Sequence, residues 1–211
     1  MKKQIAAALA LFLLFGLLLG CGAGEQPDIE SLRTKPMEEL MESAVEVVEG
    51  MRSQAGVYYK ANQCLYMVPE GYESGGSYYG GDNRWHETGW YSESQNGDQF
   101  YIYILEYDEK LENFDQLDAD AWADFLHNES HSDAVIRAKR SVDGYPAVWV
   151  ECAECWEPQH LLIDGPNGTI RISLAYCANV SSYSEMIAKA NSYDYDSLLE
   201  ELLSTLHILR K

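Results

Sequence analysis

The pattern of apolar and polar positions divides the chain into three parts. Residues 5–19 are almost continuously apolar and carry no charge, which is typical of the hydrophobic segment of a signal peptide. Residues 22–36 show no periodicity and contain glycine, proline and charged side chains, so we expect a flexible tether. Periodic patterns begin at residue 37 and predict an amphipathic helix over residues 37–53, followed by one globular domain over residues 55–211.

From Val57 onward the apolar period changes to two, which predicts β-strands. Two hairpins follow, the first with a short turn at Ala61-Asn62 and the second with Asn96-Gly97, a sequence typical of tight turns. The last strand carries apolar or aromatic side chains on both faces, so we expect both faces to be at least partly covered. The four predicted strands are residues 57–60, 63–68, 84–93 and 98–107.

The stretch between these hairpins, residues 72–83, contains four glycines and three tyrosines. Glycine has no side chain to pack and loses much backbone entropy when it is fixed in a strand. We therefore expect this stretch to be a mobile loop.

The second half of the chain predicts one helix, four strands and two further helices. Asp118 can cap the first helix, and Ser182 with Glu185 forms a capping box that begins a short helix over residues 183–190. A leucine-rich segment, residues 195–206, predicts the last helix. The four strands are residues 134–141, 146–152, 159–163 and 169–177.

This order of elements indicates an α+β fold, with a mainly antiparallel twisted sheet and helices packed on it. Residues 63–72 (QCLYMVPEGY) and 143–147 (DGYPA) resemble two short motifs of the PsbP/Mog1-like superfamily. The resemblance covers about residues 55–208. It implies an αβα sandwich with a binding or assembly role, and it brings no catalytic residues.

The apolar run ends in Leu18-Leu19-Gly20-Cys21, which resembles the lipobox of bacterial lipoproteins. In that family the cysteine is acylated and becomes the first residue after cleavage. The resemblance implies a signal peptide over residues 1–21, lipid attachment at Cys21, and a position on the extracytoplasmic face of a bacterial membrane. A retained membrane span is disfavoured because no basic cluster follows the run, and a plain secretory signal would end in small residues.

The composition adds a strongly acidic charge. The chain has 34 acidic and 15 basic residues and a net charge of −19 at pH 7. Negative charge repels phosphate backbones, so nucleic acid is excluded as a partner class, whereas protein, carbohydrate and cationic ligands stay open. Because the charge also disfavours adsorption to anionic lipid, we assign membrane attachment to the acylated Cys21.

Four cysteines follow Cys21, namely Cys64, Cys152, Cys155 and Cys177. An even number outside the cytoplasm indicates disulfides, and of three possible connectivities we expect Cys152–Cys155 with Cys64–Cys177. A redox pair is the alternative for the Cys152-x-x-Cys155 motif, but its strand-like flanks differ from the helix start that such chemistry uses.

Aromatic residues are the most distinctive feature of the sequence. The chain has fifteen tyrosines and five tryptophans. Tyrosine offers rigid, amphipathic contact area at low entropic cost, although strands also favour aromatic residues for packing alone. The candidates for a binding surface are Tyr72, Tyr78, Tyr79, Trp85, Trp90, Tyr101 and Tyr103.

No catalytic or nucleotide-binding motif is present in the sequence. His127 and His131, spaced as i and i+4, are the metal candidates, but they belong to no recognised metal motif, and we expect no metal or cofactor. The sequence therefore predicts a non-catalytic binding or assembly module on the membrane surface. The alternative is an extracytoplasmic hydrolase or thiol-redox enzyme whose site forms only in three dimensions.

Overall fold

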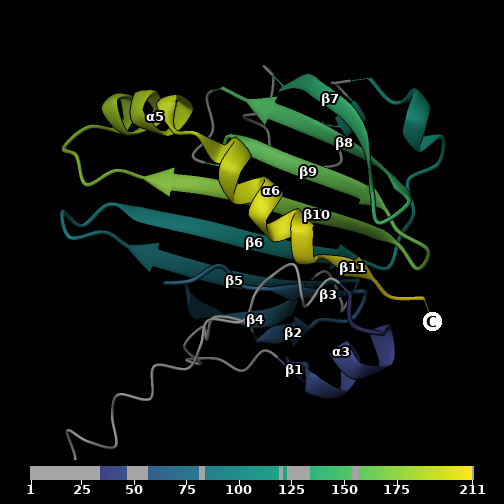
Figure 1. Cartoon of the computed structure of the whole chain (residues 1–211). Coiled ribbons are helices and arrows are strands. Elements are labelled where there is room, and N and C mark those ends of the chain that lie inside the picture. Colours follow the sequence, from purple (N-terminus) through teal and green to yellow (C-terminus); the bar gives the residue numbers. More distant parts are fainter. Residues whose placement is uncertain are drawn as a thin grey trace, which may run out of the picture.

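The structure, a computed structural model, places the elements of an α+β fold with mostly antiparallel sheets (Figure 1), as the sequence predicts. The signal segment with Cys21, most of the tether, His127, His131 and Cys155 lie outside the described residues. Those described are 34–46, 57–80, 84–118, 121–122, 134–153 and 157–210.

The larger sheet has seven strands in the order β4-β5-β6-β10-β9-β8-β7, and every neighbouring pair is antiparallel. Most of these strands were predicted from alternating apolar positions. Their bounds are β4 Glu73–Gly80, β5 Trp85–Glu93, β6 Gln99–Tyr107, β7 Ala134–Val142, β8 Tyr145–Cys152, β9 Gln159–Asp164 and β10 Thr169–Cys177.

Strand β4 corrects the prediction of a loop over residues 72–83. It pairs with β5 along its length, and a bulge between Ser74 and Gly76 accommodates the irregular backbone. Gly76 has φ +107°, which favours glycine. Glycine in a strand often marks a bulge or a close approach of two backbones, so these glycines shape the strand instead of preventing it.

The smaller sheet has the order β1-β2-β3-β11, in which β1 and β2 are parallel and the other pairs are antiparallel. The two-residue strand β11 returns the end of the chain to the first hairpin, a contact that no local pattern predicted. The bounds are β1 Val45–Glu46, β2 Tyr58–Lys60, β3 Cys64–Met67 and β11 His207–Ile208.

Helix α3, Met37–Ser43, is shorter than the predicted helix over residues 37–53. Ala44 adopts an extended conformation, and the next two residues pair with β2. The backbone of this segment therefore bonds to a neighbouring strand instead of continuing the helix, and residues 47–53 lie outside the described part of the chain.

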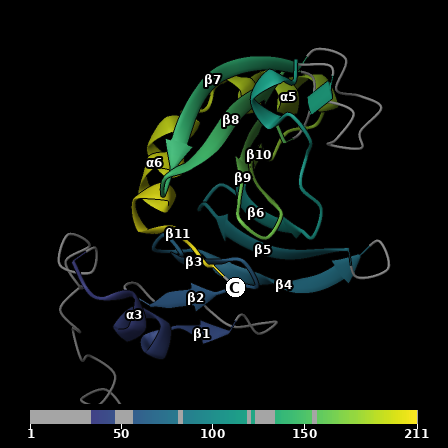
Figure 2. The same ribbon diagram turned by 90° about the vertical axis from the view of Figure 1, so that its right-hand side faces the viewer.

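The main core lies between the two sheets and helix α6, Tyr195–Thr205 (Figure 2). We call the side of the larger sheet that faces α6 the core face, and the opposite side the outer face. Helix α5, Tyr183–Ser192, begins at the predicted cap, where the Ser182 side chain accepts a hydrogen bond from the Glu185 amide. On the core face Trp90 donates a hydrogen bond to the Tyr66 hydroxyl at 3.0 Å, which links the two sheets.

A second apolar cluster covers the outer face over β8 and β9. The segment that crosses there includes the 3₁₀ helix η1, Phe114–Gln116, and Trp122, which is fully buried. The predicted cap at Asp118 is confirmed, because its side chain accepts a hydrogen bond from the Ala121 amide at 3.0 Å. The cluster consists of Phe114, Trp122, Val148, Val150, Cys152 and Leu162.

The predicted Cys64–Cys177 disulfide is wrong, since both residues carry free thiols. Cys64 lies against Glu106, whereas Cys177 is paired with Gln99 at the other end of β6. Seven residues of strand span roughly 23 Å, and a disulfide requires Cα atoms within about 7 Å. Burial, followed by the nearby Glu106 carboxylate, raises the pKa of the Cys64 thiol well above its usual value.

Within the described residues, no helix has the length and apolar character needed to cross a membrane.

Candidate functional site

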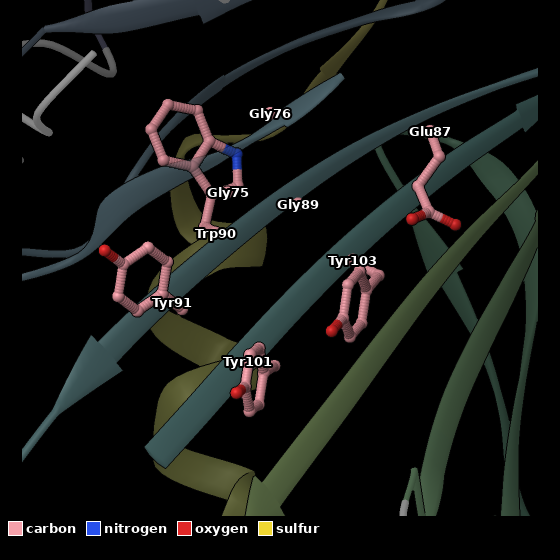
Figure 3. A pocket seen from close by; sticks show the side chains of 8 residues that line it. All are labelled: Gly75, Gly76, Glu87, Gly89, Trp90, Tyr91, Tyr101 and Tyr103. Atoms are coloured by element: carbon pink, nitrogen blue, oxygen red, sulfur yellow. The ribbon is translucent and has the colours of Figure 1, made fainter. Parts of the chain in front are cut away.

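A shallow cavity of about 150 Å³ lies on the outer face over β4, β5 and β6 (Figure 3). Its floor is formed by Gly75 and Gly76 in the bulged strand and by Gly89 in β5. A Cβ atom on Gly75 would lie 3.4 Å from the Gly89 carbonyl oxygen, and one on Gly89 would lie 3.4 Å from the Tyr103 ring. The absence of side chains at these positions therefore creates the hollow.

Aromatic rings from two neighbouring strands form the wall of the cavity. Tyr101 and Tyr103 are two residues apart on β6, so they point to the same side; their rings are parallel within 5° with centroids 5.8 Å apart. Tyr91 on β5 is the direct cross-strand partner of Tyr101. Figure 3 shows these three rings projecting beside the glycine floor.

Carboxylates give the cavity its charge. Glu87 lies on β5 two residues before Gly89 and lines the cavity. No Lys, Arg or His is among the eight lining residues. The pKa of the Tyr101 hydroxyl is raised, first by its partial burial and then by the nearby Cys177 and Glu93 side chains.

Two of the three tyrosine hydroxyl groups donate hydrogen bonds to acceptors on the strands that carry the cavity. Tyr101 donates to the Gln99 side-chain oxygen at 2.6 Å, and Tyr91 donates to Glu73 at 3.5 Å. These two protons are therefore directed at protein oxygens.

The turn between β5 and β6 is fixed by Asp98. Its carboxylate accepts hydrogen bonds from the Tyr176 hydroxyl at 2.6 Å, the Asn179 amide at 2.7 Å and the Asn96 side chain at 3.0 Å. These bonds lower the pKa of Asp98, and the bond to Asp98 raises the pKa of Tyr176 to about 12. The Asp98 carboxylate therefore holds the hairpin that carries the tyrosines against the end of β10.

The structure brings together two of the seven predicted aromatic candidates, Tyr101 and Tyr103. Tyr72 and Trp90 belong instead to the core, with exposed fractions of 7% and 1%; the expectation that they form a binding surface is wrong, because their side chains pack on the core face. Trp90 borders the cavity through its position on β5 and not through its side chain, which is buried in the core.

The remaining candidates lie away from the cavity floor. Tyr79 is 58% exposed, and its ring packs on His86 with centroids 4.6 Å apart. Trp85 is half-buried and covers Gly80. The side chain of Tyr78 lies outside the described part of the structure.

Gly75, Gly76, Gly89, Tyr91 and Glu87 were not among the candidate residues predicted from the sequence, although Gly75 and Gly76 lie in the glycine- and tyrosine-rich segment over residues 72–83. Part of the signal was present in the sequence, because residues two positions apart on a strand share a face. Gly89 and Tyr91 have this spacing on one strand, and Tyr101 and Tyr103 have it on the next. The pairing of Gly89 with both Gly76 and Tyr103 depends on strand register, which the sequence alone did not give.

A polar group of a different kind lies deeper on the outer face, between the two halves of the sheet. The Ser173 hydroxyl is 2.9 Å from Nδ1 of His160 and accepts a hydrogen bond from Arg171 at 2.8 Å. Arg171 also forms an ion pair with Glu157 at 3.0 Å. Ser173 and His160 are buried, so these contacts form a polar network in the interior of the protein.

A second buried network joins the two sheets on the core face. The Glu106 carboxylate accepts hydrogen bonds from the backbone amides of Asn62, Gln63 and Cys64, and it lies 3.2 Å from His86 Nδ1. Three amide donors on one carboxylate stabilise the charge in the interior, which favours a structural role for Glu106.

The chain matches no protein-family model, and it has no significant match among curated proteins or solved structures. The function is therefore inferred from the geometry and charge described above.

Proposed function

We propose that this protein is a lipid-anchored, extracytoplasmic binding or assembly module that acts without catalysis. Its binding site is the tyrosine surface, defined as Gly75, Gly76, Glu87, Gly89, Tyr91, Tyr101 and Tyr103. The observation that carries the proposal is the stacked Tyr101–Tyr103 pair standing beside a floor of glycine backbone on a half-exposed sheet face.

The composition of this surface favours recognition over internal packing. Half-exposed tyrosine rings keep an apolar body and a polar end available to a ligand, and they lose little entropy when one binds. Glycines at the base let the ligand approach the backbone closely. A sheet face that needed only solvent contact would require neither feature.

The test is to compare hydroxyl-radical footprinting of the purified protein with footprinting of the anchored protein on its native cells. Binding at the tyrosine surface predicts that oxidation of Tyr101 and Tyr103 falls on cells, whereas Tyr183, which is 65% exposed on α5, is oxidised equally in both samples. Equal oxidation of all three tyrosines in the two samples would contradict the proposal.

The anchor is a separate part of the proposal, based on the lipobox-like sequence at residues 18–21. Two or more acyl chains on one cysteine supply enough buried hydrocarbon for stable attachment. We expect metabolic labelling with palmitate to mark the protein and the substitution Cys21→Ser to abolish the label. Labelling that persists in the variant would remove the anchor from the account.

The αβα arrangement of the PsbP/Mog1-like superfamily is likewise proposed. The resemblance is supported by an antiparallel sheet with α6 on its core face and the η1–Trp122 segment on its outer face. It agrees with a binding or assembly role.

The Ser173–His160 pair supports hydrolysis as a second candidate function, because a serine hydroxyl within hydrogen-bond reach of an imidazole is the start of a nucleophilic site. Both side chains are buried, so a substrate would reach Ser173 only if the overlying residues moved. A fluorophosphonate probe tests the candidate: labelling lost in Ser173→Ala would favour hydrolysis, and an unlabelled native protein would count against it.

A further inference from the structure

We propose that the cavity in the tyrosine surface binds a positively charged organic group, either an alkylammonium or a guanidinium. This inference rests on the proposed binding function and specifies the class of ligand. The size of the cavity suits a small head group, and its electron-rich lining and its charge favour a cation.

The cavity has the size of a small head group. Its volume of about 150 Å³ corresponds to roughly five water molecules at about 30 Å³ each. The centroids of Tyr101 and Tyr103 are only 5.8 Å apart, so a planar group cannot enter between the two rings. A bound group would instead lie on the glycine floor, against the edges and outward faces of the rings.

The cavity offers an electron-rich lining to a positively charged ligand. The Tyr101 and Tyr91 hydroxyls already donate to Gln99 and Glu73. The Glu87 carboxylate and the π-faces of the rings are electron-rich, and aromatic faces attract cations within about 6 Å of the centroid. A sugar would stack equally well, but it needs donors as well as acceptors from the protein.

The described strands that carry the cavity, β4, β5 and β6, contain glutamates but no lysine or arginine. Glu73 and Glu93 lie on the strands that carry the cavity, beside Tyr91 and near Tyr101 respectively. The nearest basic side chain along the Glu87 row is Arg171, which is two strands away across Leu105. Arg171 forms an ion pair with Glu157, which partly neutralises its charge, so the carboxylates on the strands of the cavity favour a positively charged ligand.

The experiment is a titration of the purified full-length protein, followed by NMR chemical shifts, with charged and neutral probes of matched shape. Choline is compared with 3,3-dimethyl-1-butanol, and acetyl-arginine methylamide with its citrulline analogue; cellobiose represents carbohydrate. We expect each cation to bind about tenfold more tightly than its neutral counterpart. The stronger of the two cations then distinguishes a small quaternary ammonium ligand from a basic protein side chain.

Two variants place the binding at this cavity. Tyr103→Ala is expected to weaken cation binding about tenfold and Glu87→Gln about threefold, whereas the matched controls Tyr183→Ala and Glu112→Gln leave it unchanged. Glu87→Gln keeps the ring packing intact, so it remains informative even if Tyr103→Ala fails to fold.

Equal affinity for a cation and its neutral counterpart, or the same affinity in Glu87→Gln and the native protein, would overturn the inference. Cellobiose bound in preference to both cations would also overturn it while leaving the proposed function in place. The proposed function itself is tested separately. It would fail if Tyr101 and Tyr103 were oxidised equally in the purified protein and on native cells.

Discussion

The two halves of the outer face differ although they belong to one continuous sheet. Over β8 and β9 the side chains are mostly apolar, and the chain covers them with Phe114 and Trp122. Over β4, β5 and β6 the same face carries tyrosines, glycines and a glutamate around a shallow cavity. The covered half is completed by the protein's own chain, whereas the tyrosine surface consists of residues that tolerate both water and a ligand.

This difference shows how one sheet face can serve stability at one end and recognition at the other. Aliphatic side chains stabilise the fold only when they are removed from water. The covered half therefore depends on the segment with Phe114 and Trp122 that shields it. Tyrosine rings gain from burial yet remain soluble through their hydroxyl groups. Changes in the covered half should therefore affect unfolding, and changes in the tyrosine surface should affect binding.

The largest effect is expected from Trp122→Ala in the covered half. Trp122 is fully buried and packs edge-to-face on Phe114 with centroids 4.5 Å apart. Its removal leaves a cavity and should lower the free energy of unfolding by about 3–5 kcal/mol, measured by urea denaturation. A loss below about 1 kcal/mol would show that the covering segment contributes little to stability. It would contradict the assignment of the covered half to stability and of the tyrosine surface to binding.

The glycine floor allows a sharper comparison within the bulge. Gly76→Ala should destabilise the fold by about 1–3 kcal/mol, because φ +107° is strained for any residue with a Cβ. Gly75→Ala is the matched control, since a Cβ there meets only a contact of 3.4 Å, and its stability should change by less than about 1 kcal/mol. Similar losses in both variants would contradict the role assigned to the bulge.

The hairpin of the tyrosine surface should show a pH-dependent contribution from Asp98. The pKa of Asp98 is lowered in the folded state by its hydrogen bonds to Tyr176 and Asn179, so its stabilisation is present above the unfolded value, near pH 4, and is lost as the pH falls through the lowered pKa. Asp98→Asn should unfold more easily than the native protein at pH 7.

The difference in unfolding between these two proteins should narrow as the pH falls below about 4. A difference that stays constant from neutral to acidic pH would show that the charge on Asp98 is not what matters.

The smallest effect on stability is expected from Tyr101→Ala in the tyrosine surface. The side chain is half-exposed, and its ring stacks on Tyr103 on the outer face of the sheet. The free energy of unfolding should therefore fall by about 1 kcal/mol or less. A loss as large as that of Trp122→Ala would mean that the tyrosines act as core residues.

The sequence predicted those elements whose signals are local. Alternating apolar positions located most strands of the larger sheet, and the Ser182–Glu185 capping box located the start of α5. Strand β4 was missed because its glycines lack a pattern, and its pairing with β5 depends on a bulge. Strand β11 has only two residues, and it exists through pairing with a distant partner.

The site was predicted only where residues two positions apart share a face. Tyr101 and Tyr103 satisfy that rule, whereas Tyr72 and Trp90 have the same residue types but point into the core. Which face of a strand is buried depends on the tertiary structure. The place of Gly89 beside Gly76 and Tyr103, and the separation of Cys64 from Cys177, likewise follow from strand register.

Site-specific photo-crosslinking on native cells can show whether the tyrosine surface contacts a ligand. A photoreactive phenylalanine analogue is placed at position 103, and the same analogue at position 183 on α5 serves as the control. The account predicts a discrete adduct, seen as a mass increase, from position 103 and none from position 183. Adducts formed equally from both positions, or from position 183 alone, would contradict the assignment of the tyrosine surface as the binding site.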